Sequence, residues 1–443
     1  MKLSSPADKG IPMRKVFIYA MNFAPEVAGV GHYTGEIGEE FIANGHAVTV
    51  VTTPPHYPGW AATPPYRSGR YAVETREGAR VIRCPLILRR RMGGIWRLIA
   101  PLSFAVTSAP IALWQILARR PDVVLCIEPT LMVAPLAVLA ARLIGARTVL
   151  HVQDLEVDAC FAVGHLGHRP WLEALASRLE RRILAGFDRL ITISTPMAAR
   201  LVAKGVAAER IAVVRNWVDL DHIKPLERTS AYRTELGLSD RDRIALYSGN
   251  IGAKQGLRDV IAAARLLSAR PDLKFVIAGE GPAKAALQAE AADLANVRFL
   301  PFQPYQRLSE FLGLADVHIL PQAADAADLV LPSKLGGMLA SGRRIVVTAA
   351  PETELATFLA GAAFVAPPGD AAALAAAIEQ AADAAPDESR ATRRRSLAER
   401  LSKPDCLSDF RALVMRPASI LAGQGGASGG ASEVLEPPRE AVS

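Results

Sequence analysis

The chain has 443 residues, of which 50% are hydrophobic and 21% are charged, and its formal net charge is +7 at pH 7. This composition excludes a disordered chain, and the length predicts two domains, because one hydrophobic core seldom organises more than roughly 250–300 residues. Aromatic residues make up only 6% of the chain, so the basic surplus favours phosphates or acidic lipids over stacked single-stranded nucleic acid.

The four cysteines, Cys84, Cys126, Cys160 and Cys406, are scattered and form no CxxC pair. Their spacing matches neither a zinc site nor a disulfide framework and is typical of a reducing cytosol. The polar residues 1–13 lack the apolar stretch of a signal peptide, so we expect a flexible N-terminus and a cytoplasmic protein. No spacing of potential ligands predicts a metal site.

Short apolar runs alternate with helical segments in the first half of the chain. Residues 15–20 read as a buried strand, a glycine-bearing loop follows at 24–31, and a helix is expected over about 32–43. Asn44-Gly45 ends that helix before a second strand at 47–52. This order is a βαβ unit and predicts a parallel sheet. Further strands are predicted at 80–83, 122–127, 147–151 and 189–194.

The same alternation starts again after a polar, proline-marked stretch. The fold class predicted is therefore α/β, with two Rossmann-like, doubly wound parallel-sheet lobes. Strands of the second series are expected at 243–249, 274–279, 297–300, 317–320 and 345–348. The predicted domain plan is an amino-terminal lobe at 14–215, a linker at 216–240, a second lobe at 241–385, a helical segment at 386–422 and a disordered tail at 423–443.

An uncharged segment, Leu98 to Ala118, is flanked by arginines and is long enough to cross a membrane. Pro101 and Pro110 interrupt it, and the sheet pattern resumes immediately at 121–127, which argues against a membrane span. A buried core helix and an interfacial helix pair remain as alternatives, and we favour the interfacial pair, with arginines on lipid phosphates. The residues expected to face the membrane or the acceptor are Arg89, Arg90, Arg91, Trp96, Arg97 and Trp114.

Gly29 and Gly31 follow the first strand, where glycines allow backbone N–H groups to approach an anion at a helix N-terminus. A dinucleotide fingerprint would require glycine in place of Thr34 and an acidic residue after the second strand, where Thr52-Thr53 stands. The pattern therefore argues against a nicotinamide dehydrogenase. A purely structural tight turn remains the alternative.

His151 lies at the carboxyl end of a predicted strand, the edge where ligands bind in open α/β sheets. A histidine there can hydrogen-bond a sugar hydroxyl or stabilise a developing charge. The alternative is a loop histidine that is satisfied by backbone groups.

Three loops of the second half combine glycine with cationic or hydroxyl side chains. Residues 248–256 lack the spacing of a P-loop, yet a glycine-relaxed loop with a lysine at a helix start suits a diphosphate. Pro332 near the first turn of a helix, with Ser and Lys beside it, makes a further anion site. The candidate donor-binding residues are Gly249, Asn250, Lys254, Gly279, Glu280, Gly281, Ser333 and Lys334.

Five segments resemble the retaining glycosyltransferases of family 4, and more narrowly the WcaI-type branch of colanic acid and exopolysaccharide biosynthesis. The similarity extends over roughly residues 14–385, and the combination is specific although each piece is short. The segments are Tyr19 to Glu36, Ala43 to Thr52, Pro54 to Pro58, Leu331 to Leu335 and Met338 to Arg343.

The resemblance implies a GT-B fold, two Rossmann-like lobes facing a cleft, with the donor on the second lobe and transfer that retains the anomeric configuration. It implies no metal or cofactor beyond a nucleotide diphosphate sugar as co-substrate, and a lipid-linked saccharide acceptor at the inner membrane surface. By the resemblance, Gly31 would lie against the donor diphosphate, His151 near the donor sugar, and Lys254 on the diphosphate, assisted by Ser333 and Lys334. His151 and Lys254 are thus the candidate catalytic residues.

Two departures from the family pattern stand out. Asn250 replaces a frequent arginine, and Leu329 and Gly337 occupy the positions of two glutamates that contact the donor, so donor identity is not implied. Two rival hypotheses stay open. A nucleotide-sugar 2-epimerase shares the fold, and a non-catalytic nucleotide-sugar-binding partner of an assembly complex would account for the missing carboxylates.

Overall fold

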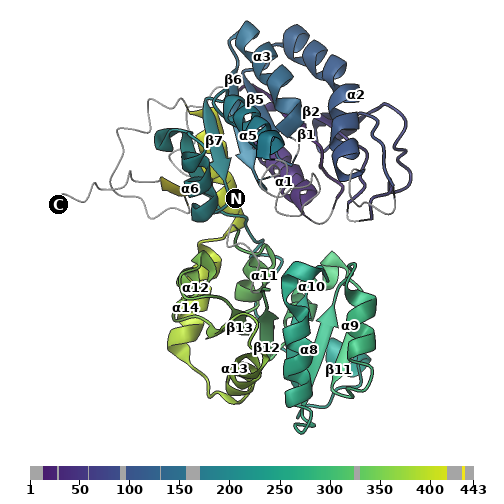
Figure 1. Cartoon of the computed structure of the whole chain (residues 1–443), viewed down its shortest axis with the longest axis vertical. Helices are drawn as coiled ribbons and strands as arrows, with labels where there is room; N and C mark the ends of the chain where they lie inside the picture. The colour runs from purple at the N-terminus through teal and green to yellow at the C-terminus, as the bar shows by residue number, and fades with distance from the viewer. Residues whose placement is uncertain are drawn as a thin grey trace, which may run out of the picture. The chain divides into compact units, whose positions relative to one another are not determined.

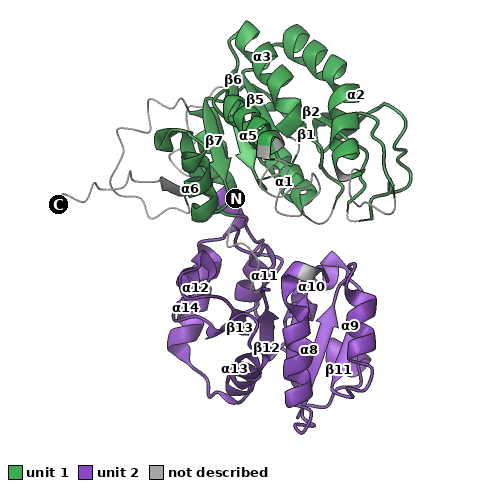
Figure 2. Ribbon diagram, viewed as in Figure 1, with its two compact units in different colours: residues 1–215, 407–443 green, residues 216–406 purple. Residues whose placement is uncertain are grey.

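The computed structural model of the chain describes residues 13–26, 29–57, 59–89, 96–129, 131–155, 170–323, 330–416 and 432–434. The contacts between residues divide the chain into two units, shown in Figures 1 and 2. Unit 1 comprises residues 1–215 and 407–443, and unit 2 comprises residues 216–406. Each unit is built around a sheet of its own.

Within the described residues, unit 1 contains a nine-stranded sheet in the order β15-β8-β7-β6-β5-β1-β2-β4-β3. Strands β3 and β15 run antiparallel to their neighbours, and the other pairings are parallel. The strands are β1 Lys15–Ala20, β2 Ala47–Thr52, β3 Ala72–Arg76, β4 Ala79–Arg83, β5 Val123–Ile127, β6 Arg147–Val152, β7 Arg189–Thr192, β8 Ile211–Val214 and β15 Ser432–Val434.

The central strands of this sheet are apolar on both faces because helices cover both. Residues 16–20 of β1 are all buried, and so is the whole of β5. The helices are α1 Val30–Ala43, α2 Trp96–Arg119, α3 Ala134–Ile144, α5 Pro170–Leu184, α6 Thr195–Ala203 and α15 Lys403–Met415.

The apolar segment of unit 1 forms one 24-residue helix, α2, so the expected pair of helices is corrected to a single helix. Pro101 and Pro110 both lie inside it. A proline removes one helical hydrogen bond, that to the carbonyl four residues earlier. For Pro110 this is the carbonyl of Val106, a residue that is 67% exposed, and the helix continues through this position without a break.

The chain returns to unit 1 within α15. Phe410 lies edge-on to His151 at 4.8 Å between ring centroids, and Arg411 donates from Nε to Glu40 Oε1 at 2.9 Å. Beyond it, residues 432–434 pair with β8, inside the stretch for which the sequence predicts disorder. The remainder of that stretch, like residues 1–12, lies outside the described residues.

As far as the structure is described, unit 2 contains a six-stranded parallel sheet in the order β11-β10-β9-β12-β13-β14. Alternate residues of its strands face opposite sides of the sheet. One side packs in an apolar cluster with α8 and α13, and the other is divided between a cluster with α11, α12 and α14 and a smaller one with α7 and α10. The strands are β9 Arg243–Ser248, β10 Leu273–Ala278, β11 Val297–Leu300, β12 Val317–Leu320, β13 Arg344–Thr348 and β14 Phe364–Ala366. The helices are α7 Tyr232–Glu235, α8 Leu257–Leu266, α9 Lys284–Glu290, α10 Leu308–Leu312, α11 Lys334–Ala340, α12 Glu354–Phe358, α13 Ala371–Asp383 and α14 Glu388–Glu399.

Residues 216–240, for which the sequence predicts a linker, are packed into unit 2. The backbone N–H of Val218 donates to the carbonyl of Leu401 at 2.8 Å, and the carbonyl of Val218 accepts from Lys403 at 3.0 Å. Tyr232 is buried, and its ring lies edge-on to Phe311.

In each sheet, the side on which successive strands are added changes at a strand near the middle. In unit 1, β1 lies between β2 and β5, and in unit 2, β9 lies between β10 and β12. At such a switch point the loops leaving neighbouring strands diverge, and ligands of doubly wound folds bind there, beyond the carboxyl ends of the strands. A ligand of unit 2 is therefore expected at the loops after β9 and β12.

Candidate functional site

The loops after β9 and β10 are packed backbone against backbone. A Cβ on Gly279 would lie 1.8 Å from the carbonyl oxygen of Gly249, and one on Gly281 would lie 2.2 Å from that of Ile251. The backbone N–H of Ile251 also donates to the carbonyl of Glu280 at 2.8 Å. Only glycine permits this approach. Gly249, Gly279 and Gly281, all predicted from the sequence, therefore lie together at the switch point, and we call these three residues the glycine ledge.

Lys334, the first residue of α11, reaches this ledge from the other side of the switch point. Its Nζ donates to the Tyr247 hydroxyl at 2.9 Å and lies 4.1 Å from the centroid of the same ring. A Cβ on Gly249 would be 3.3 Å from Nζ. The Tyr247 hydroxyl in turn donates to the carbonyl of Asn250, so lysine, ring and loop form one chain of contacts.

Burial lowers the pKa of Lys334 to about 7. No carboxylate pairs with this amine among the residues that the structure describes. The amine is thus held in place by a hydroxyl and an aromatic face, and its positive charge is not neutralised. Such a group favours an incoming anion.

Lys254 lies on the short helix η4, Ala253–Gln255, and its side chain is exposed. Its carbonyl accepts from the backbone N–H of Ala323 at 3.2 Å, and a Cβ on Gly256 would lie 2.8 Å from the carbonyl group of Gln322. The loop that carries Lys254 is therefore fixed against the segment after β12. Its ammonium has no ion-pair partner within the described ranges.

The remaining predicted residues of this edge are exposed. Asn250 presents its side chain to solvent, and Ser333 precedes α11 without a side-chain bond to the helix. Glu280 pairs with Lys284, whose Nζ lies 2.7 Å from Oε1 and also donates to the carbonyl of Gly279 at 2.9 Å. The sequence reasoning missed Lys284, although its place four residues after Glu280 at a helix start is a recognisable signal.

In unit 1, Gly29 and Gly31 begin α1 beyond the end of β1. Gly29 has a φ of 64°, and a Cβ on Gly31 would lie 2.2 Å from Glu26 Oε2. Glu26 is buried and was also missed. Its Oε1 accepts the backbone N–H groups of His56 and Tyr57 at 2.9 and 3.0 Å. This carboxylate ties the loop after β2 to the start of α1, and Gly31 leaves room for it.

His151 lies within β6 and is fully buried, whereas the sequence places it at the strand's end. Its Nδ1 lies 3.2 Å from the carbonyl oxygen of Ile191, and its Nε2 lies 2.8 Å from the amide nitrogen of Gln153. Burial lowers the pKa of His151 to about 4, so the ring is neutral near pH 7. In that tautomer Nδ1–H donates to Ile191 and Nε2 accepts from Gln153. The first side chain beyond the strand is that of Gln153.

The residues predicted to face a membrane are only partly described. Arg89 stacks on Trp96 at 3.8 Å from the ring centroid, and Trp114 is 57% exposed. Arg90 and Arg91 lie outside the described residues, and the structure gives no side-chain placement for Arg97.

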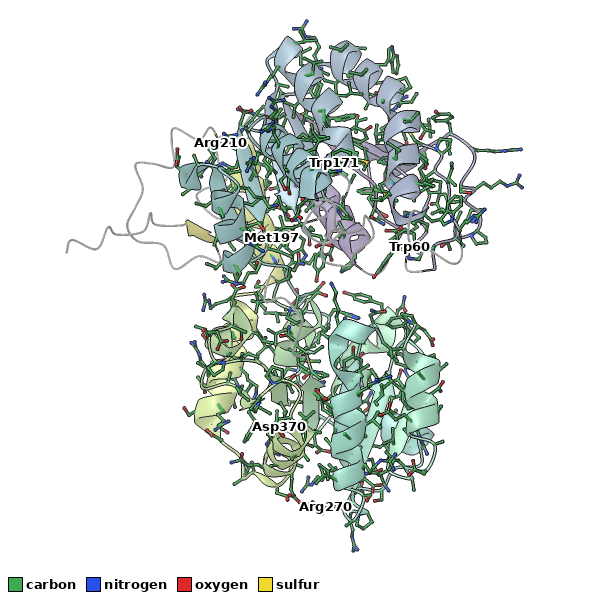
Figure 3. The ribbon with its side chains drawn as sticks, in the orientation of Figure 1. Trp60, Trp171, Met197, Arg210, Arg270 and Asp370 are labelled. Carbon is green, nitrogen blue, oxygen red and sulfur yellow. The ribbon has the colours of Figure 1, made fainter. Side chains whose placement is uncertain are left out.

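Three helices of unit 1 expose large apolar side chains. One of them, α2, is the single helix within the described ranges that is long and apolar enough to cross a membrane by length and composition, and 33% of its apolar window is buried. Helix α3 packs against α2, and Arg142 of α3 donates to the carbonyl of Gly186 just after α5. Figure 3 shows Trp171 on α5. We call this the apolar face; its exposed residues are Leu102, Val106, Trp114, Leu117, Leu136, Leu139, Leu143, Trp171, Leu175 and Leu179.

Within the described residues, the carboxyl edge of the unit 2 sheet carries two cations without carboxylate partners and a glycine ledge. No group of three or more His, Cys, Asp or Glu side chains that could hold a metal ion occurs in the described part of the chain.

Two protein-family models match the chain. Residues 28–217 match the glycosyl transferase 4-like domain, and residues 229–397 match the glycosyl transferases group 1 domain. The chain is 41% identical over 381 residues to the colanic acid biosynthesis glycosyl transferase WcaI of Escherichia coli (strain K12), covering 83% of this chain and 92% of that protein. It is 35% identical over 167 residues to a D-inositol 3-phosphate glycosyltransferase of Nocardia farcinica (strain IFM 10152), covering 34% and 36% of the two chains.

Solved structures show the same fold at low identity. Sucrose-phosphate synthase from Thermosynechococcus elongatus matches with a TM-score of 0.69 and 16% identity, over 92% of this chain and 99% of that one. Anabaena HepE in complex with UDP-glucose matches with a TM-score of 0.63 and 14% identity, over 90% and 98% of the two chains. The chain therefore belongs to the glycosyl transferases of the GT4 type and has their GT-B fold, with a glycosyl transferase 4-like domain followed by a group 1 domain.

Proposed function

We propose that this glycosyl transferase takes its sugar from a nucleoside diphosphate donor whose diphosphate binds at the carboxyl edge of the unit 2 sheet. The observation that carries the proposal is Lys334, an amine without a carboxylate partner in the described ranges, held on Tyr247 against Gly249. A diphosphate supplies the negative charge that this amine lacks. The UDP-glucose complex of the structurally similar HepE supports a nucleotide sugar as the donor to test first.

Lys254 and the ledge complete the proposed donor site. The exposed ammonium of Lys254 neutralises a second phosphate oxygen, and the absence of side chains at Gly279 and Gly281 lets the remaining oxygens approach the backbone. Asn250, Glu280 and Ser333 are exposed at the same edge, where they contact the donor's hydroxyl groups.

The proposed transfer retains the anomeric configuration and needs no metal. The bond between the anomeric carbon and the diphosphate oxygen breaks, and Lys254 and Lys334 stabilise the charge that grows on the leaving group. An acceptor hydroxyl attacks the same face of the sugar, its oxygen bonds to the anomeric carbon, and its proton passes to the departing phosphate. The products are the glycosylated acceptor and the nucleoside diphosphate.

In unit 1, His151 acts as a positioning residue. Its neutral ring accepts from the amide nitrogen of Gln153 and so fixes this buried residue just beyond the strand end. Because Gly29 and Gly31 carry no side chain, a ligand oxygen can approach the N–H groups in the first turn of α1, which have no partner within the helix. If His151 acts through Gln153, the two substitutions should have similar effects. Measurable turnover in Gln153→Ala together with complete loss in His151→Asn would contradict this role.

The experiment for the proposal is a transfer assay that uses a panel of nucleotide diphosphate sugars and lipid extract as acceptor, with product analysis at the anomeric centre. Transfer with retention, unchanged by EDTA, supports it. Conversion of the donor without acceptor would instead indicate an epimerase. Donor binding without transfer to any extracted acceptor would indicate a non-catalytic binding partner.

The acceptor side of the proposal is a lipid-linked, polyprenyl-diphosphate-borne oligosaccharide of exopolysaccharide synthesis, reached from the cytoplasmic surface of the inner membrane. The name of the WcaI relative supports the pathway. The apolar face supports the location, because the packed helices α2 and α3, which expose Trp114 and Leu139, also expose basic residues, Arg119 and Arg142. Apolar side chains entering the acyl boundary, with arginines at the headgroups, are typical of monotopic proteins.

Vesicle sedimentation tests this location. Wild-type protein is expected on phosphatidylglycerol vesicles and much less on phosphatidylcholine vesicles. Trp114→Ser with Leu139→Ser removes two side chains, each worth roughly 1.5–3 kcal/mol of burial, so binding falls at least tenfold. Leu266→Ser is the matched control, because Leu266 is 60% exposed but lies on α8 of unit 2. Equal loss in the control and the double variant would contradict the assignment.

A further inference from the structure

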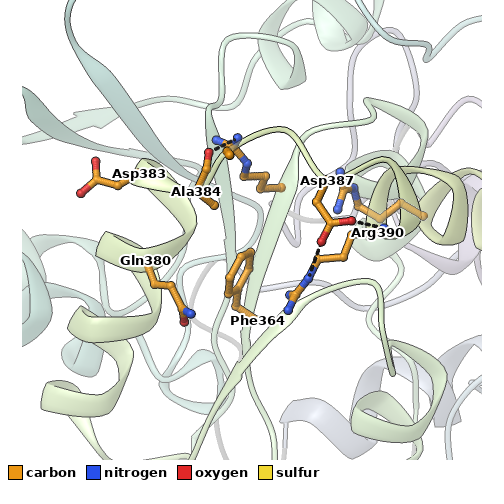
Figure 4. Close-up of a pocket in the computed structure, with 9 residues that line it drawn as sticks. Phe364, Gln380, Asp383, Ala384, Asp387 and Arg390 are labelled. Carbon is orange, nitrogen blue, oxygen red and sulfur yellow. Dashed lines mark hydrogen bonds and ion pairs between the residues drawn. The ribbon is translucent and has the colours of Figure 1, made fainter.

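A second basic site lies at the opposite edge of the unit 2 sheet. It is a cavity of about 450 Å³ between β13, β14, α13 and α14, shown in Figure 4. Arg344 and Phe364 are the first residues of β13 and β14, so the cavity is at the amino edge, whereas the glycine ledge follows the carboxyl ends. Arg390 and Arg394 of α14 complete its basic lining.

The two carboxylates that line this cavity are already engaged. Asp383 accepts from both terminal nitrogens of Arg270 at 2.9 and 3.1 Å, and in Figure 4 its carboxylate points away from Phe364. Asp387 accepts the backbone N–H of Arg390 at 3.0 Å and lies 3.2 Å from its Nε. Neither carboxylate makes a direct ion pair with the other two arginines of the lining, although the charge of Asp387 partly offsets that of Arg394.

Within the described residues, neither Arg344 nor Arg394 has a carboxylate partner. Arg344 donates from Nη2 to the carbonyl of Ala384 at 2.6 Å, and Arg394 donates from Nη1 to that of Ala362 at 3.2 Å. Arg394 is only 6% exposed, and its buried Nε has no hydrogen-bond partner. Carbonyl oxygens satisfy single N–H groups but do not neutralise a guanidinium charge.

A buried, unneutralised charge is costly, and two guanidinium groups beside one cavity also repel each other. Burial, followed by the charge of Arg344, lowers the pKa of Arg394. A bound oxyanion would remove both penalties, because each guanidinium offers paired N–H donors that match the oxygens of a phosphate. The Arg390 guanidinium is stacked on the ring of Phe364 at 4.3 Å from its centroid, and the Gln380 amide remains for an uncharged part of the ligand.

We propose that this cavity is a binding site for a free phosphate-class oxyanion, separate from the donor site. Its volume exceeds that of a single phosphate and admits a small phosphorylated molecule. The site contains no residue of the donor-binding loops, so its occupancy does not depend on the proposed transfer. A molecule bound there stabilises unit 2 by mass action.

Titration calorimetry with inorganic pyrophosphate tests the proposal. The full-length chain carrying Lys254→Ala and Lys334→Met serves as background, so that the donor site does not contribute. The background is expected to bind pyrophosphate. Adding Arg344→Gln should weaken binding at least tenfold, because a charge-assisted pair of hydrogen bonds is lost. Arg393→Gln, the same change on an exposed arginine of α14, should leave binding unaltered.

Arg394→Gln should act like Arg344→Gln, but its buried side chain also packs, so its melting temperature without anion is measured first. The half-buried Arg344 keeps the test valid if Arg394→Gln unfolds. Absence of pyrophosphate binding in the background, or equal binding by Arg344→Gln and Arg393→Gln, would overturn the proposal. So would a result in which Arg344→Gln affects only binding to phosphatidylglycerol vesicles, since the ligand would then be a lipid headgroup.

Discussion

Lys334 Nζ lies 2.9 Å from the hydroxyl of Tyr247, although the two residues are 87 positions apart in the chain. The Tyr247 ring and Gly249 together hold this amine beside the loop that follows β9. This contact joins the strand that begins unit 2's sheet to the helix that follows β12. It is the structural basis of the proposed diphosphate site.

Replacing Lys334 by methionine should lower turnover by roughly 10²-fold, the scale on which one group stabilising a leaving charge acts. Lys254→Ala should have an effect of similar size. The measurement is kcat/KM with a nucleotide diphosphate sugar that the wild type uses. Lys224→Met is the matched control, because Lys224 is exposed elsewhere on unit 2 and the charge change is the same. Near-wild-type rates for Lys334→Met would contradict the assigned role.

Donor affinity should depend on pH through Lys334. Its pKa in the free enzyme is about 7, below the ordinary 10.5, so the amine is charged below pH 7 and increasingly neutral above it. Binding of an anion favours the charged form, and above pH 7 binding must therefore take up a proton. The dissociation constant should rise by up to about tenfold per pH unit between pH 7 and the pKa of the complex.

Lys334→Arg provides the control for this pH dependence, since arginine stays charged throughout. Its donor dissociation constant should be flat from pH 6 to 9, as should the weaker one of Lys334→Met. A slope that persists in Lys334→Met would assign the titration to another group.

Acid should destabilise unit 1 through His151. Its pKa is about 4 in the folded chain, against an ordinary 6.5, so the unfolded chain binds more protons between these values. The free energy of unfolding is therefore largest above pH 6.5 and falls as the pH is lowered toward 4. The loss is about 3 kcal/mol at most. His151→Asn should remove this part of the pH dependence, measured by urea unfolding. His318 in unit 2, whose pKa burial lowers to about 3, should act in the same direction.

Gly31 should tolerate no side chain while Glu26 is present. Gly31→Ala places a Cβ 2.2 Å from Glu26 Oε2 and should cost about 1–3 kcal/mol of unfolding free energy. Gly59→Ala is the control, since nothing lies within 4 Å of its added Cβ. A double variant, Glu26→Gly with Gly31→Ala, should be more stable than the sum of the single effects predicts, because the Cβ of Glu26 itself lies 2.7 Å from the added Cβ and must also be removed. Strict additivity would show that the two residues do not interact.

The sequence predicted the interior of both sheets well. The central strands are uninterrupted apolar runs, because parallel strands covered on both faces leave no polar alternation, and their observed bounds agree within about two residues. The edge strands β3, β14 and β15 were missed, because they are short or half exposed and an edge strand lacks the apolar signal that marks a central one. Strand β8 was missed as well although all four of its residues are buried, because so short an apolar run does not by itself distinguish a strand.

The candidate site was predictable only in part. Glycine loops after strands have a recognisable pattern, so Gly249, Gly279 and Gly281 could be named from the sequence. The Tyr247–Lys334 contact could not, because it depends on which strands are neighbours in the sheet. The predicted end of the strand at His151 differs from the observed end by one residue, and one strand residue more or less decides whether a side chain is enclosed or lies beyond the end.

A structure of the chain with the nucleoside diphosphate of its donor bound tests the central claim most directly. The account predicts phosphate oxygens within hydrogen-bonding distance of Lys334 Nζ and Lys254 Nζ, above Gly249 and Gly279. A diphosphate bound elsewhere on unit 2, with both amines left in solvent or on Tyr247 alone, would contradict it.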